Sequence, residues 1–288
     1  MDCHSEAGLV AALELIDPPR VVFGGGTNLV VSDDGYAGSV IRYGASAITE
    51  VRLATGSALV ADSGTELDRL VEYTVDRGLA GMECLRRIPG WVGGAVYGNA
   101  GAYGQQISDW LVAVRIHDGV RIRELTAAEC GFVYRGSIFK QHKNWVILSA
   151  AFQLPPGDRA ALAERAEKIR ATRDAKFPPS MKCAGSVFKN LHVDRLPAGA
   201  LARVPEQVIQ HGKVPAAWFL EQVGAKGRQV GGMRVADYHA NLVYNDGQGT
   251  AGELVVLIDG LKAEVAAKFG FFLEEELQFV GFPTRKSF

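Results

Sequence analysis

R-V-V-F-G-G-G-T-N-L-V-V, at residues 20–31, joins two apolar runs through three successive glycines. The runs at 21–23 and 29–31 favour β-strands, so residues 24–28 are expected to form a turn between strands. A P-loop or a Rossmann glycine loop would open a helix, and no helical pattern follows here. Two interpretations of the turn stay open: a tight hairpin, or a nest of backbone N–H groups, supplemented by Thr27 and Asn28, that binds phosphate oxygens.

Glycine is frequent throughout the chain. It supplies 34 of 288 residues (34/288, about 12 %), against roughly 7 % in an average protein. Only 11 residues are proline and no Gly-X-Y period is present, which excludes collagen and low-complexity linkers. With 48 % hydrophobic and 22 % charged residues the chain can bury a sizeable core. The glycines are therefore expected at specific positions where the backbone conformation requires glycine.

Charge and cysteine usage exclude several function classes. The net charge of −1 argues against binding nucleic acid by bulk electrostatics. The first residues lack the basic region of a signal peptide, and no apolar run reaches the roughly 18–20 residues of a membrane span, so a cytoplasmic protein is expected. The four cysteines are widely separated without a C-x-x-C pair, which predicts neither disulfides nor a metal site.

Periodicity predicts an α+β chain in two parts. Helices are expected at 5–16, 65–77 and 158–172, after Pro215, and after the capping box Thr250-x-x-Glu253. Strands are expected at 20–23, 29–31, 40–42, 48–53, 58–61, 112–116, 145–154, 185–189, 241–244 and 272–280. Pro178 and Pro179 mark the boundary between the parts. The glycine-dense stretch 81–104 is expected to be a long functional loop.

Further blocks along the chain carry a family resemblance. They are Ile88-Pro89-Gly90-Trp91-Val92-Gly93-Gly94-Ala95, Asn99-Ala100-Gly101-Ala102-Tyr103-Gly104, Tyr134-Arg135-Gly136-Ser137-Ile138-Phe139, Ala184-Gly185-Ser186-Val187-Phe188-Lys189-Asn190, and the segment from Leu273 to Gly281. Together with the first glycine turn, and in this order, they resemble the UDP-N-acetylenolpyruvoylglucosamine reductases, also called UDP-N-acetylmuramate dehydrogenases. The match covers nearly the whole chain.

The resemblance implies a fold and a cofactor. It implies a vanillyl-alcohol-oxidase (PCMH-type) FAD-binding region over residues 1–175, with two lobes divided near 45–50. A substrate-binding domain over 176–288 would follow, its last strand returning Glu276 to the active site. No tyrosine lies between Leu154 and Pro178, which resembles the shorter class of the family without a tyrosine-bearing loop. The FAD would be noncovalent, held by Gly24, Gly25, Gly26, Thr27, Asn28, Leu29, Ile88, Pro89, Gly90, Gly93, Gly94, Asn99, Gly101 and Ala102.

The resemblance also implies an activity in peptidoglycan precursor synthesis. NADPH would reduce the flavin, which would then reduce UDP-N-acetylglucosamine enolpyruvate to UDP-N-acetylmuramate. Arg135 would stabilise developing negative charge, Ser186 would donate the proton, and Glu276 would lie near the substrate carboxylate. Substrate-binding positions would be Tyr103, Lys176, Asn190, Lys226, His239 and Gln278. A monomer is expected, with a small nucleotide sugar as its partner.

Two other functions remain open from the sequence. One is a flavin-dependent sugar or alcohol oxidase of the same wider fold, which would use dioxygen and would not need a serine donor. The other is a non-catalytic relative that only binds the nucleotide sugar. The second is motivated by the 23 residues before Gly24, which lack the Asn-Thr-containing strand that family members usually carry there.

Overall fold

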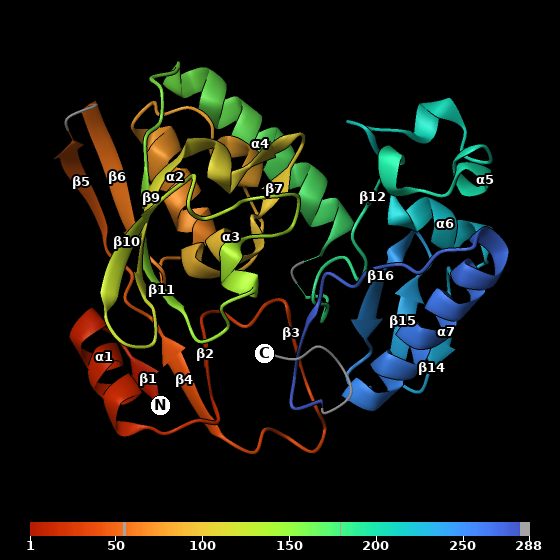
Figure 1. The fold of residues 1–288 in the computed structure, drawn as a ribbon. Helices are drawn as coiled ribbons and strands as arrows, with labels where there is room; N and C mark the ends of the chain where they lie inside the picture. The colour runs from red at the N-terminus through yellow and green to blue at the C-terminus, as the bar shows by residue number, and fades with distance from the viewer. Residues whose placement is uncertain (54–55, 179, 283–288) are drawn as a thin grey trace. The chain divides into compact units, whose positions relative to one another are not determined.

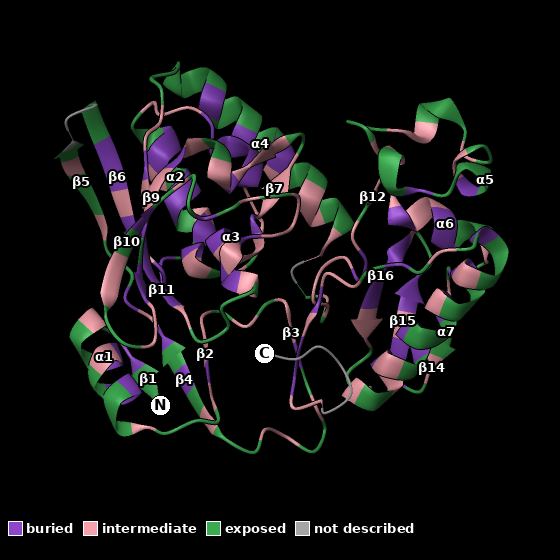
Figure 2. Ribbon diagram, in the orientation of Figure 1, coloured by how far each residue is buried: buried purple, intermediate pink, exposed green. Residues whose placement is uncertain are grey.

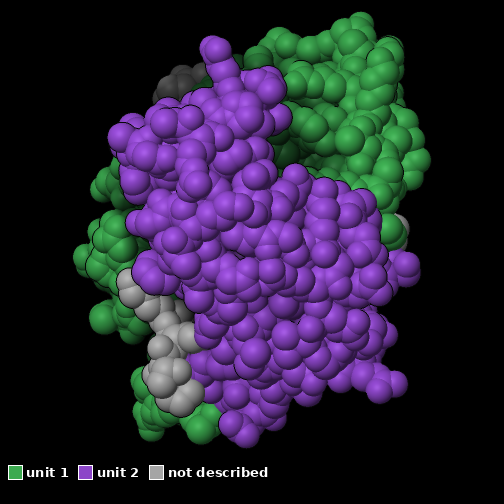
Figure 3. All heavy atoms as spheres, turned by 90° about the vertical axis from the view of Figure 1, so that its right-hand side faces the viewer, with its two compact units in different colours: residues 1–26, 37–178 green, residues 27–36, 179–288 purple. Residues whose placement is uncertain are grey.

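The computed structural model describes residues 1–53, 56–178 and 180–282, and the chain forms two compact units (Figures 1 and 3). Unit 1 contains residues 1–26 and 37–178, and unit 2 contains residues 27–36 and 179–288. The chain had been expected to divide into 1–175 and 176–288, without the return of residues 27–36 to the second part. Pro179, proposed as a boundary residue, lies outside the described residues.

Unit 1 begins with a small parallel sheet. Its strands are β1 (Asp2–Cys3), β4 (Ser39–Tyr43) and β2 (Arg20–Phe23), in the order β1-β4-β2. Helix α1 (Glu6–Leu15) starts as predicted at Ser5, whose Oγ accepts a hydrogen bond from the Gly8 N–H at 3.1 Å. Leu9 and Leu13 of this helix pack with Ile41 in one apolar cluster. This cluster is the core of the N-terminal lobe.

The larger sheet of unit 1 is antiparallel. Its order is β10 (Ile122–Thr126), β9 (Leu111–His117), β11 (Val146–Phe152), β6 (Gly56–Asp62) and β5 (Ile48–Leu53). The central strand β11 is apolar apart from Ser149, because both of its faces are covered. Leu148 joins the α1 cluster, whereas Ile147 and Phe152 join the main core. Strand β10 was not predicted, because only Leu125 among its residues is buried.

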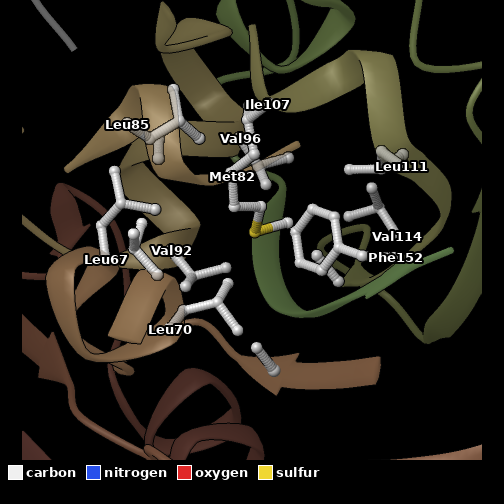
Figure 4. Close-up of a cluster of buried hydrophobic side chains, with 14 of the residues drawn as sticks. Leu67, Leu70, Met82, Leu85, Val92, Val96, Ile107, Leu111, Val114 and Phe152 are labelled. Atoms are coloured by element: carbon white, nitrogen blue, oxygen red, sulfur yellow. The ribbon is translucent and has the colours of Figure 1, made fainter. Parts of the chain in front are cut away.

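Three helices of unit 1 contribute to the main core. They are α2 (Leu67–Asp76), α3 (Val92–Gly98) and α4 (Arg159–Lys176). The connecting segments contain the short helices η1 (Glu83–Leu85), η2 (Ile107–Trp110) and η3 (Ile138–Lys140). They also contain the hairpin of β7 (Gly101–Ala102) and β8 (Gln105–Gln106). Figure 4 shows Leu70 of α2, Val96 of α3 and the Phe152 ring directed into this core, with Met82 beside the ring. Helix α4 continues beyond the predicted end at Thr172, so Lys176 is helical.

Unit 2 is built on a small antiparallel sheet and one long helix. The sheet order is β14 (Gln229–Val230), β15 (Met233–Ala236) and β16 (His239–Asn245). The other elements are β12 (Leu191–His192), β13 (Lys213–Val214), η4 (Val193–Arg195), η5 (Glu206–Val208), α5 (Ala198–Leu201), α6 (Ala216–Gln222) and α7 (Ala251–Phe269). The predicted capping box of α7 is confirmed, and its buried stripe includes Leu254, Leu261 and Val265. Figure 2 shows α7 with one buried and one exposed side.

The segment 27–36 is part of unit 2 because its strand pairs there. Strand β3 (Leu29–Val31) runs parallel to β17 (Gln278–Val280), with Val30 opposite Phe279. Asp33 then caps helix α7: its carboxylate accepts hydrogen bonds from Ala251 N–H at 2.9 Å and Gly252 N–H at 2.8 Å. The predicted strand 272–280 is thus shortened to its last three residues, and Leu277, Phe279 and Val280 are buried.

The Asp33 cap makes a pH-dependent contribution to the stability of unit 2. The two backbone hydrogen bonds, that from Ala251 first, lower the pKa of Asp33. A carboxyl with a lowered pKa in the folded state stabilises the fold at pH above its unfolded pKa, about 3.9, and loses this effect as pH falls through the folded pKa. Asp33→Asn should therefore unfold at lower denaturant concentration than the wild type at pH 7, with a smaller difference below about pH 4. A difference independent of pH, measured by chemical unfolding, would contradict this account.

Candidate active site

The first glycine turn is not a hairpin. Strand β2 pairs with β4 in unit 1, whereas β3 pairs with β17 in unit 2, so the boundary between the units falls between Gly26 and Thr27. The hairpin interpretation is therefore wrong. A Cβ at Gly24 would lie 3.0 Å from Trp91 Cε3, and one at Gly25 would lie 3.4 Å from Trp91 Cδ1. Gly26 has φ +69°, a conformation that glycine adopts without strain. The turn thus packs against the second glycine-rich segment of the sequence.

The second glycine-rich segment contains a short helix where a long loop was predicted. Helix α3 begins after Trp91 and ends at Asn99, which adopts the left-handed conformation. A Cβ at Gly93 would lie 2.8 Å from the Cβ of Ser63, so close packing accounts for that glycine. No atom lies within 4 Å of a Cβ built at Gly94. Packing within the described residues thus leaves open backbone at Gly94, which is compatible with a flat ligand lying against it.

The side chain of Asn99 organises the chain around Arg135. It is fully buried, its Nδ2 donates to Gln106 Oε1 and to the Val133 carbonyl, each at 3.0 Å, and its Oδ1 accepts from the Ser108 N–H at 3.4 Å. Asn99 was expected to contact the cofactor. Through these bonds the Asn99 side chain holds together three backbone segments of unit 1.

Arg135 lies on a strained turn and is held by backbone carbonyls. Its φ is +53°, which is uncommon for a residue with a side chain. Its Nη2 donates to the Gly101 carbonyl at 2.8 Å and its Nη1 to the Asn99 carbonyl at 3.4 Å. Lys140 Nζ donates to the Arg135 carbonyl at 2.8 Å. The loop after α3 therefore sets the position of this guanidinium group.

A group of cations near Arg135 includes one residue that the sequence analysis missed. Burial lowers the pKa of Arg173, and the Arg135 charge lowers it further, whereas Tyr103 has the opposite effect. Loss of hydration and the charge of Arg173 also lower the pKa of Lys176. The Asp68 carboxylate raises the pKa of Arg173 and so offsets part of this positive charge. An anion bound here would relieve the repulsion that remains. The spacing of three residues between Arg173 and Lys176 places both on one face of a helix, and this spacing was the sequence signal that could have identified Arg173.

Asn99 supports a prediction about this part of the structure. Asn99→Ala removes three hydrogen bonds and leaves buried partners unsatisfied, which should lower the free energy of unfolding by roughly 1–3 kcal/mol. The matched control is Asn144→Ala, because Asn144 makes one exposed bond, to the Asp118 carbonyl at 3.2 Å. It should change stability by at most about 0.5 kcal/mol. Equal effects of the two variants in chemical unfolding would contradict the role given to Asn99.

In unit 2, Ser186 follows Gly185 in a segment held by a buried asparagine. Asn241 in β16 accepts from the Phe188 N–H at 2.9 Å through Oδ1 and donates to the Phe188 carbonyl at 2.8 Å through Nδ2. Residues 185–189 were predicted as a strand. They instead make single bridges, Ser186 to Leu242 and Phe188 to Glu275. Asn241 escaped the sequence analysis because an asparagine within an apolar strand carries no sequence signal for this contact.

Glu276 lies beside the segment that carries Ser186. The Glu276 N–H donates to the Val187 carbonyl at 2.8 Å, and Lys189 N–H donates to the Glu274 carbonyl at 2.9 Å. Side-chain contact between Lys189 and Glu274 adds an ion pair at the edge of this segment. Unit 2 thus brings the proposed proton donor and the proposed glutamate together on neighbouring backbone segments, while Arg135 belongs to unit 1.

The remaining expected site residues have mixed surroundings. Lys226 Nζ pairs with Glu221 Oε1 at 2.7 Å, and Asn190 Oδ1 accepts from the Ala216 N–H at 3.2 Å. Gln278 donates to the Glu276 carbonyl at 3.3 Å. Tyr103 is 50 % exposed, and its φ is +53°. His239 opens β16, Leu29 opens β3, Ile88, Pro89 and Gly90 precede α3, and Gly101 and Ala102 form β7.

Two family models match the chain. A sequence model described as the C-terminal domain of UDP-N-acetylenolpyruvoylglucosamine reductase matches residues 177–280, and one described as an FAD binding domain matches residues 2–120. No helix among the described residues is long and apolar enough to cross a membrane.

Named relatives and a solved structure cover nearly the whole chain. The UDP-N-acetylenolpyruvoylglucosamine reductase of Solibacter usitatus is 51 % identical, over 91 % of this chain and 82 % of that protein. The reductase of Rubrobacter xylanophilus is 38 % identical, over 96 % of this chain and 86 % of its own length. The crystal structure of the Thermus caldophilus enzyme matches with a TM-score of 0.72 and 27 % identity, over 97 % of this chain and 91 % of that one. The chain therefore belongs to the UDP-N-acetylenolpyruvoylglucosamine reductase family.

Proposed function

We propose that this chain reduces UDP-N-acetylglucosamine enolpyruvate to UDP-N-acetylmuramate, with NADPH as hydride donor and noncovalent FAD. The observation that carries the proposal is the hydrogen bond from Glu276 N–H to the Val187 carbonyl, at 2.8 Å. It holds the Glu276 segment beside Ser186. The proposed reaction needs a group that binds the substrate carboxylate close to a group that donates a proton. Membership of the reductase family supplies the substrate.

The residues of the glycine segments fit a flavin dinucleotide. Gly26 with its positive φ suits a diphosphate-binding turn, and the open backbone at Gly94 suits a flat ring. Bound FAD would accept hydride from NADPH and transfer it to the terminal carbon of the enolpyruvyl group. The side chains of the protein then have two tasks, to stabilise negative charge on the substrate and to supply the second hydrogen.

Arg135 would stabilise the negative charge that hydride addition places on the substrate carboxylate and its neighbouring carbon. Its guanidinium is preorganised by the Gly101 and Asn99 carbonyls, so little reorganisation is needed during the reaction. Ser186 would donate its hydroxyl proton to the carbon next to the carboxylate, where the opened double bond leaves an electron pair. Glu276 would contact the substrate carboxylate as a protonated or hydrogen-bonded carboxyl.

Ser186→Ala tests the proton donor. Reduction of the flavin by NADPH should proceed as in the wild type, because that step needs no proton from Ser186. Anaerobic reoxidation by UDP-N-acetylglucosamine enolpyruvate should slow by about 10²–10⁴-fold. Stopped-flow absorbance separates the two half-reactions, and Ser57→Ala, at an exposed position of β6, is the control. Unchanged reoxidation by the substrate in Ser186→Ala would refute the role of Ser186, and rapid reoxidation by dioxygen alone would favour an oxidase.

Arg173 and Lys176 are proposed to bind the substrate diphosphate together with Tyr103. Arg173→Met keeps the length of the side chain but removes a charge, and should raise KM for the nucleotide sugar about 10–100-fold. Reduction of the flavin by NADPH should be unaffected. The control is Arg159→Met on the same helix, whose guanidinium makes an exposed pair with Asp76 at 3.0 Å. An unchanged KM in Arg173→Met would remove Arg173 from the substrate site.

We propose that a monomer is active, with the nucleotide sugar and NADPH as its small-molecule partners. The cytoplasm is the proposed location, as the sequence analysis expects.

A further inference from the structure

Asn28 contacts the Glu276 segment through both its main chain and its side chain. The Gln278 N–H donates to the Asn28 carbonyl at 3.0 Å. In the opposite direction, Asn28 Nδ2 donates to the Glu276 carbonyl at 3.0 Å. The two bonds bracket Leu277, whose side chain is only 5 % exposed and packs in the core of unit 2. Asn28 therefore forms hydrogen bonds to the chain on both sides of the buried residue Leu277.

The peptide groups of Glu276 are consequently held from two directions. Its N–H is bound by the carbonyl of Val187, next to Ser186, and its carbonyl is bound by the amide of Asn28. A carboxylate side chain takes its orientation from the backbone that carries it. The position of Glu276 relative to Ser186 thus depends on both hydrogen bonds.

Asn28 is itself placed on a fixed element. It directly precedes β3, which pairs with β17 over three residues. Ser32 N–H continues this pairing to the Val280 carbonyl at 2.9 Å, and Asp33 fastens the following turn to helix α7. The Asn28 amide is therefore presented by a backbone that is anchored at both the sheet and the helix.

We propose that Asn28 is a positioning residue for Glu276, in addition to its place in the cofactor turn. Its side-chain amide holds the main chain of Glu276 in register with Ser186, so this contact acts on the reduction of the enolpyruvyl group. This inference rests on the proposed role of Glu276. It links the glycine turn to the catalytic segment of unit 2 through one side chain.

Two variants of Asn28 test this role. Asn28→Ala removes the donor, and Asn28→Asp keeps the size of the side chain but turns a carboxylate oxygen toward the Glu276 carbonyl. All rates are measured at saturating FAD, because Asn28 also belongs to the cofactor turn and a loss of flavin affinity must be separated from the effect on the Glu276 segment. Reoxidation by the enolpyruvyl substrate should slow by about tenfold in Asn28→Ala, as expected for one lost hydrogen bond, and by more in Asn28→Asp. Loss of flavin with normal reoxidation at saturating FAD would overturn the proposal.

A double-mutant cycle distinguishes positioning from general damage. If Asn28 acts through Glu276, then Asn28→Ala should slow reoxidation no further in a chain that already carries Glu276→Ala. Losses that multiply in the double variant would show that the two residues act independently, and would overturn the proposal.

Hydrogen–deuterium exchange provides a readout that does not depend on turnover. The peptide covering residues 273–282 should exchange about tenfold faster in Asn28→Ala than in the wild type. The control is Asn245→Ala, because Asn245 donates to the Gly249 carbonyl at 2.6 Å and accepts from Gly247 and Gly249, so its loss should affect only that turn. Unchanged exchange in residues 273–282 would overturn the proposal. A wild-type protein whose reduced flavin is not reoxidised by the substrate would refute the proposed function instead, while the exchange result would still test the contact.

Discussion

The parallel pairing of β3 with β17 is the constraint on which the rest of unit 2 depends. It joins residues 29–31 to residues 278–280, which are far apart in the sequence. This pairing and the Asp33 cap on α7 bring a ten-residue segment of the N-terminal half into the C-terminal unit. The chain must therefore cross between the units within the first glycine turn. A glycine at 26, with its positive φ, lets the backbone make that crossing without strain.

Two of the proposed catalytic residues, Arg135 and Glu276, share one physical feature, because backbone carbonyls position each of them. Carbonyls of Gly101 and Asn99 hold the Arg135 guanidinium, and the Val187 carbonyl holds the Glu276 peptide. Buried asparagine side chains complete the arrangement, since an amide can donate and accept at once and so can bind both polar groups of a peptide. Asn241 does this for Phe188. Such contacts fix position more firmly than exposed ion pairs do.

Most secondary structure could be predicted because its signals are local. Ser5 caps α1, and Thr250 and Glu253 form the capping box of α7. Helix α3 was missed because glycines at 93, 94 and 98 mask its helical propensity. The segment 185–189 has strand-like residues but only isolated bridges, since its hydrogen bonds go to Asn241, Leu242 and the chain before β17. Local pattern does not encode those partners.

The amino-acid sequence by itself determined the family, the α+β class, the glycine segments and the identities of Arg135, Ser186 and Glu276 as candidates. Only the tertiary structure decided that residues 27–36 belong to unit 2, that the first glycine turn is not a hairpin, and that Asn241 bonds to Phe188 and the Asn28 side chain to the Glu276 carbonyl. The physical reason is that strand pairing and buried hydrogen bonds join residues that are distant in the sequence. Local periodicity predicts an element but not the distant partner with which it pairs.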